Sequence, residues 1–135
     1  MNTTKTLLEQ LTAKIEASYT EGVTVLQAER LAGEFLAAQL SIAHKLQTAD
    51  LDARMRKSGV KALRAGVYME AATKTDKKPS DVMLEAIVNK DKMVQSEQDG
   101  LDTAEVERAT LERYYDIFLN AHIFFRGIAK GSFGG

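Results

Sequence analysis

Residues 51–68, LDARMRKSGVKALRAGVY, carry the clearest helical pattern of the chain. Four basic side chains and one tyrosine recur there at spacings of three and four, which bring side chains to one side of an α-helix. These residues are Arg54, Lys57, Lys61, Arg64 and Tyr68. At about 100° per residue they span a sector roughly 80° wide, and we call them the basic stripe. The pattern predicts a helix over about residues 50–72, opened by a cap near Asp50.

The other half of this helix is expected to be buried against the rest of the protein. Its apolar residues are Leu51, Met55, Ala62, Leu63 and Val67. Gly59 and Gly66 lie on the same side, seven residues apart. Each costs roughly 1 kcal/mol relative to alanine in an exposed helix. Their spacing suits close packing against another helix, and a kink is an equally compatible explanation.

Helical periodicity continues through most of the chain and predicts an all-α fold of elongated helical hairpins or a bundle. Residues 1–130 are expected to form one domain, followed by a flexible glycine-rich tail at residues 131–135. The first expected helix closes near Gly22, and a capping box of Thr24 and Gln27 opens the second. The basic helix comes next and is followed by a polar loop at residues 73–81. After it we expect a short helix through residues 82–88 and a long final helix from about Asp91 to Ala129, with Gly100 as its weak point.

Composition excludes several classes of chemistry. The chain has 135 residues and no cysteine, so disulfides, thiolate catalysis and cysteine-based zinc sites are ruled out. Its two histidines, His44 and His122, lack carboxylates at helical spacing, and nucleotide-binding glycine motifs are missing. No catalytic residues, metal site or cofactor are therefore predicted. The polar N-terminus and the interrupted apolar stretches predict a soluble, cytoplasmic protein that does not enter a membrane.

Charge is segregated along the chain, although the net charge is only −1. Residues 53–78 contain eight Lys or Arg against two Asp or Glu, and residues 79–116 contain four against ten. The basic block can face a polyanion such as a nucleic-acid backbone, or it can pair with the acidic block of the same or a neighbouring subunit. An ordinary solvated face is a third explanation. Alternatively, the acidic stretch at residues 97–116 could mimic DNA and bind a basic protein.

The end of the final helix is apolar on all sides, which requires that it be surrounded. Because a small helical monomer offers few places to enclose such a segment, a subunit interface is the preferred explanation. The interface residues are expected to be Tyr114, Tyr115, Ile117, Phe118, Leu119, Phe124, Phe125 and Ile128. The sequence therefore predicts a homo-oligomer.

The chain resembles the phage UvsY-type recombination mediators over roughly residues 30–130. The resemblance rests on the run Lys78-Pro79-Ser80-Asp81, on Leu84-Glu85-Ala86-Ile87-Val88 with Asp91 and Val94, on Ala121, Arg126 and Gly127 in the C-terminal helix, and on the order of helices. It departs from the family pattern in its slightly acidic balance and in a longer spacing before Lys61.

The resemblance implies a small helical protein that assembles into a ring-like oligomer and binds single-stranded DNA. Such a protein helps a RecA-like recombinase replace the single-strand-binding protein, here in the cytoplasm of a host cell. The implied DNA contacts are Lys61 and Arg64, supported by Arg54, Arg56 and Lys57. Tyr68 would offer a ring on which a base can stack. The runner-up is a structural or adaptor oligomer without enzymatic activity, in which basic and acidic blocks pair with each other or with a protein partner.

Overall fold

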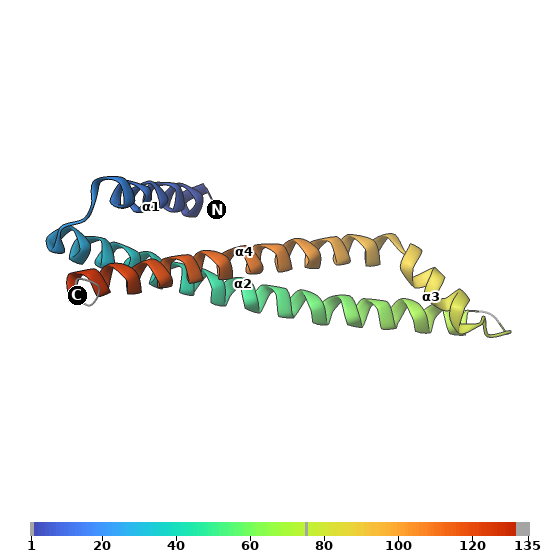
Figure 1. The fold of residues 1–135 in the computed structure, drawn as a ribbon. Helices are drawn as coiled ribbons and strands as arrows, with labels where there is room; N and C mark the ends of the chain where they lie inside the picture. The colour runs from blue at the N-terminus through green and yellow to red at the C-terminus, as the bar shows by residue number, and fades with distance from the viewer. Residues whose placement is uncertain (1, 75, 132–135) are drawn as a thin grey trace. The chain divides into compact units, whose positions relative to one another are not determined.

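The computed structural model describes residues 2–74 and 76–131, and every regular element in those ranges is a helix. The elements are α1 (Asn2–Glu21), α2 (Val25–Thr73), α3 (Asp81–Lys90) and α4 (Lys92–Ala129), shown in Figure 1. The predicted all-α class and the long C-terminal helix are therefore confirmed. Most of the predicted tail, residues 132–135, lies outside the described residues.

The break between α1 and α2 follows the sequence signals. Gly22 adopts φ 78°, a left-handed conformation that favours glycine, and its N–H donates to the Ser18 carbonyl at 3.1 Å. Thr24 and Gln27 then form the expected capping box. The Thr24 N–H donates to Gln27 Oε1 at 3.0 Å, and the Gln27 N–H donates to Thr24 Oγ1 at 3.2 Å.

The prediction of a separate basic helix is wrong, because the second helix and the basic helix form one element of 49 residues. No proline or glycine separates the two predicted segments. Asp50, expected to act as a cap, instead forms an ion pair with Arg54 at 3.1 Å, four residues further along the helix. A carboxylate in this position fits a helix interior as well as a helix start, so the sequence alone did not distinguish them.

A single residue, Asp91, separates α3 from α4. Its N–H donates to the Val88 carbonyl at 3.2 Å and closes α3, and its carboxylate accepts from the Val94 N–H at 3.0 Å and opens α4. At its other end α3 is capped by Ser80, whose hydroxyl accepts from the Met83 N–H at 3.3 Å. Beyond Asp91, α4 continues through Gly100 without interruption.

The chain divides into two compact units, and α2 and α4 each contribute residues to both. Unit 1 comprises residues 1–47 and 109–135. At its centre Phe35 of α2 packs between two rings of α4, with centroid distances of 6.1 Å to Phe118 and 5.7 Å to Phe125. The buried α2 residues of this unit are Ala28, Ala32, Phe35, Ala38, Gln39 and Ile42. Apart from Ala38, they alternate at spacings of four and three, which are typical of a coiled-coil seam.

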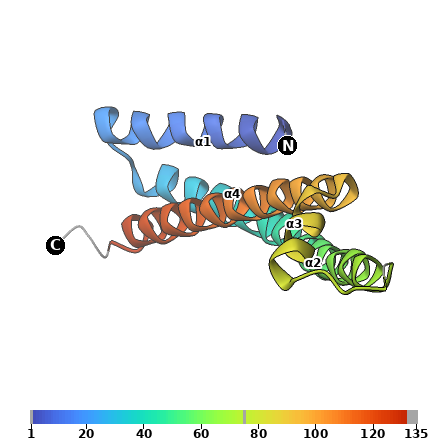
Figure 2. The ribbon, with the colours of Figure 1, turned by 90° about the vertical axis from the view of Figure 1, so that its right-hand side faces the viewer.

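Unit 2 comprises residues 48–108. Its buried residues are Ala53 and Val60 of α2, Leu84 and Val88 of α3, and Val94, Leu101 and Ala104 of α4. Both ribbon views show α3 beside the end of α2 (Figures 1 and 2). Small α2 side chains therefore face the core of unit 2, and α3 supplies larger ones.

The expectation for the apolar half of the basic helix is only partly met. Leu63 and Val67 are half-buried, but Leu51 and Met55 are 60% and 66% exposed, and Ala62 is exposed as well. The predicted contact of Gly59 and Gly66 with another helix is also missing within the described chain. A Cβ atom added at Gly59 or Gly66 would meet no atom within 4 Å.

In the part of the chain that the structure describes, no helix is both long and apolar enough to cross a bilayer.

Candidate nucleic-acid interface

The basic stripe lies on the part of α2 that belongs to unit 2, and its members differ in exposure. Arg54, Lys57 and Lys61 are exposed, whereas Arg64 and Tyr68 are half-buried. Arg64 and Tyr68 lie against α3, with which both form polar contacts. The stripe therefore has an open part, formed by the first three residues, and a covered part, formed by the last two.

Lys57 and Lys61 are the open cations of the stripe. Neither has an ion pair or hydrogen bond with any residue that the structure describes, and they lie four residues apart on one side of α2. Arg54 is also open to solvent, with a side chain 77% exposed, but it forms an ion pair with Asp50. Because exposed ion pairs are weak and easily exchanged, Arg54 can still contact another anion.

The covered part of the stripe contacts α3 through polar groups. Arg64 Nη2 donates to Asn89 Oδ1 at 2.9 Å and lies 3.4 Å from Glu85 Oε2. The Tyr68 hydroxyl donates to Asp81 Oδ1 at 3.0 Å. This hydrogen bond, with smaller effects of desolvation and of the charges of Asp81 and Glu85, raises the pKa of Tyr68.

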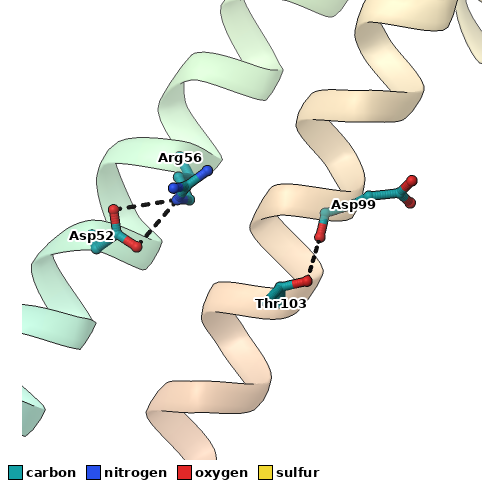
Figure 3. Close-up of polar contacts among 4 residues, drawn as sticks. All are labelled: Asp52, Arg56, Asp99 and Thr103. Atoms are coloured by element: carbon teal, nitrogen blue, oxygen red, sulfur yellow. Dashed lines mark hydrogen bonds and ion pairs between the residues drawn. The ribbon is translucent and has the colours of Figure 1, made fainter. Parts of the chain in front are cut away.

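Arg56 is exposed as well, with 44% of its side chain accessible, but it lies apart from the stripe. Its expected role as a supporting DNA contact stays a prediction. It lies on a different side of α2 from the stripe, and its Nε donates to both carboxylate oxygens of Asp52, at 3.1 and 3.2 Å (Figure 3). Its guanidinium lies against α4, where a Cβ added at Gly100 would lie 2.8 Å from Arg56 Nη1. Glycine at position 100 therefore gives the guanidinium room beside the α4 backbone.

Arg56 lies beside a shallow hollow of unit 2, and the carboxylate that pairs with it is that of Asp52. Asp52, Asp99 and Glu107 line this hollow together with Arg56, Gly100, Thr103 and Ala104. Figure 3 shows Asp99 and Thr103 on successive turns of α4, where the Thr103 hydroxyl donates to the Asp99 backbone carbonyl at 2.9 Å. The Asp99 carboxylate points away from Arg56 (Figure 3), so the guanidinium pairs with Asp52 alone among these residues.

Two of the predicted interface residues are buried inside the chain. Phe118 and Phe125 are fully buried in unit 1, so they form its core and are not available to a second subunit. The physical reason is that Phe35 and the other buried residues of α2 cover one side of α4. Tyr114, Tyr115, Leu119 and Ile128 are half-buried, and Ile117 and Phe124 are each 37% exposed.

Sequence reasoning missed several polar partners. Asp81, Glu85 and Asn89 lie four residues apart on α3, a spacing that forms one edge of a helix and could have indicated a partner for the stripe. His122 Nδ1 lies 2.8 Å from the Ala32 carbonyl, a contact between residues 90 positions apart that no local pattern predicts. Among the described residues no cluster of His, Cys, Asp or Glu is arranged to bind a metal ion.

Comparison with protein-family models, curated proteins and solved structures finds no significant match to this chain. The resemblance to UvsY-type mediators therefore stays a hypothesis based on the residues given above.

Proposed function

We propose that this protein binds single-stranded DNA and acts as a recombination mediator, helping a RecA-like recombinase to replace the single-strand-binding protein. One observation carries the DNA-binding part of the proposal. Lys57 and Lys61 are exposed on one side of α2, within the most basic block of the chain, and have no anionic partner among the described residues. The resemblance in helix order and in the segment after the basic helix supports the mediator part.

The proposed mechanism is electrostatic. Cations of the stripe contact successive phosphates and release condensed counterions, so affinity falls steeply as salt concentration rises. Two open lysines and one shared arginine give only weak binding for a single subunit. Assembly of several subunits would multiply the contacts through effective concentration, which is why a homo-oligomer, in ring form by resemblance, is part of the proposal.

A second candidate function is a structural or adaptor protein without enzymatic activity. The contact between Arg64 and Glu85 favours it, because there a cation of the basic block pairs with an anion of the acidic block inside unit 2. In that case the stripe would serve the fold or a protein partner, and free DNA would not be a ligand. The two candidates differ in the expected behaviour of Lys57 and Lys61.

The first prediction tests the open cations by charge reversal. The double variant Lys57→Glu/Lys61→Glu should bind single-stranded DNA at least about tenfold more weakly, and its salt dependence should fall by roughly 0.7 per lost phosphate contact. Both side chains are exposed, so the fold should be retained. The measurement is fluorescence anisotropy of a labelled single-stranded oligonucleotide, titrated at low and moderate salt beside a duplex.

The matched control is Lys92→Glu/Lys130→Glu, which makes the same change in net charge at two exposed lysines outside the stripe. It should lose much less affinity than the stripe variant. Equal losses for both variants would indicate a response to net charge alone. Wild-type protein that does not bind even at low salt would overturn the proposed function and favour the adaptor.

A further inference from the structure

The covered part of the stripe has an anionic partner built into the chain. Asp81, Glu85 and Asn89 form one edge of α3, and they face Tyr68 and Arg64 of α2. Two carboxylates and one amide oxygen thus occupy the donors that phosphates would use. This arrangement concerns the same surface to which we assign DNA binding.

The attachment of α3 to α2 is limited. Helix α3 has ten residues, a length at which an isolated helix is marginal in water, so its stability depends on packing. Only Leu84 and Val88 are buried, and the opposite side of α3 exposes Val82 and Met83.

The polar contacts of α3 are also accessible to solvent. The side chains of Arg64 and Glu85 are 34% and 57% exposed, and at 3.4 Å their ion pair is long. Exposed pairs of this kind contribute little to stability and are weakened by competing ions. A polyanion could therefore displace Glu85 from Arg64 without exposing a large buried charge.

We propose that α3 is a tethered internal anion that competes with nucleic-acid phosphates for Arg64 and Tyr68. The open lysines would bind first, and the covered part of the stripe would join only when α3 moves away from it. The tethered carboxylates thereby lower the affinity of the protein for DNA. They also make that affinity depend more strongly on how many phosphates the oligonucleotide offers, because further phosphates are needed to displace α3. This inference rests on the proposed DNA-binding function.

The test removes the internal anion without removing a donor. Replacing Glu85 by glutamine keeps the size of an exposed side chain and removes one negative charge next to Arg64. The affinity of Glu85→Gln for a fluorescein-labelled oligothymidine at low salt should rise about three- to tenfold, since one repulsive charge beside the phosphate is lost. Asp81→Asn/Glu85→Gln should raise it further.

Two controls separate release of Arg64 from a general charge effect. Glu105→Gln makes the same charge change at an exposed position of α4 in unit 2 and should leave affinity close to wild type. In an Arg64→Ala background, Glu85→Gln should give no gain, because the donor that it frees is missing. A gain that persists without Arg64, or that Glu105→Gln reproduces, would overturn the inference.

Failure of this inference differs from failure of the proposed function. If wild-type protein binds the oligonucleotide, Lys57→Glu/Lys61→Glu weakens binding at least about tenfold and Glu85→Gln leaves it unchanged, then α3 is not a competitor and DNA binding stands. If neither wild type nor Glu85→Gln binds at low salt, DNA binding fails, and the role of α3 as a competitor fails with it.

Discussion

At the scale of single residues, Tyr68 gives a direct report on the contact between α2 and α3. Its neutral hydroxyl donates to Asp81, and this contact raises the pKa of Tyr68 above that of a free phenol. Because the pKa of Tyr68 is higher in the folded than in the unfolded protein, the contact makes its full contribution to the stability of unit 2 at pH values below the ordinary phenol pKa. That contribution is lost as pH rises through the raised value, because the phenolate can no longer donate.

The corresponding prediction is that Asp81→Asn lowers the pKa of Tyr68 toward its ordinary value. The measurement is an alkaline titration of phenolate absorbance. Tyr68→Phe provides the reference, because its difference from wild type isolates one tyrosine of the four in the chain. Superimposable wild-type and Asp81→Asn curves would show that the hydrogen bond is missing in solution.

Residue-level roles were only partly predictable from the sequence. Spacing correctly placed Thr24 and Gln27 in a capping box, because both partners lie within one turn. It could not show that Arg64 faces Glu85, since that contact depends on where α3 folds back. Phe118 and Phe125 were assigned to an interface because a segment that is apolar on all sides does not reveal which side the same chain covers.

At the scale of elements, α2 is a long helix with three interior glycines, Gly33, Gly59 and Gly66, of which the last two lie within the span of the basic stripe. Gly59 and Gly66 lie in its interior, and alanine at either position would meet open space. We predict that Gly66→Ala raises the free energy of unfolding by about 0.5–1 kcal/mol, because alanine loses less backbone entropy in a helix. Urea denaturation followed by circular dichroism would measure it.

The control is Gly22→Ala, which should be destabilising because Gly22 has φ 78° between α1 and α2. A contrary result for Gly66→Ala, with lower stability and a smaller assembly in sedimentation, would show that another copy packs on this side of α2. The sequence supplied the position of both glycines, but it could not show that their side of the helix is open within the chain.

At the scale of the whole molecule, the proposed oligomer requires apolar surface that the chain itself leaves exposed. On the last part of α4 this surface includes Ile117, Ile123 and Phe124, whereas Phe118 belongs to the core. Ile117→Glu should therefore reduce the assembled mass measured by light scattering while the helical content remains. Phe118→Ala should instead lower the free energy of unfolding by about 3–5 kcal/mol.

The two α4 substitutions distinguish assembly from folding, because adjacent residues of one helix face different surroundings. An unchanged mass for Ile117→Glu would exclude this surface from assembly, and a monomeric wild type at all concentrations would remove the oligomer from the proposal. The sequence predicted the helical class and the long last helix from periodicity. The division into two units depends on packing between residues far apart in the sequence, and helical periodicity does not predict such packing.

If α3 turns about the single-residue junction at Asp91, its other end, which the loop of residues 74–80 joins to α2, moves furthest. Ten helical residues span about 15 Å, so a rotation of roughly 20° about this junction would swing the far end by about 5 Å. The three polar contacts lie at increasing distance from Asp91, at Asn89, Glu85 and Asp81. Such a rotation would separate Tyr68 from Asp81 first and Arg64 from Asn89 last. The stripe would then open gradually along α2, from the tyrosine toward the lysines, rather than in a single step.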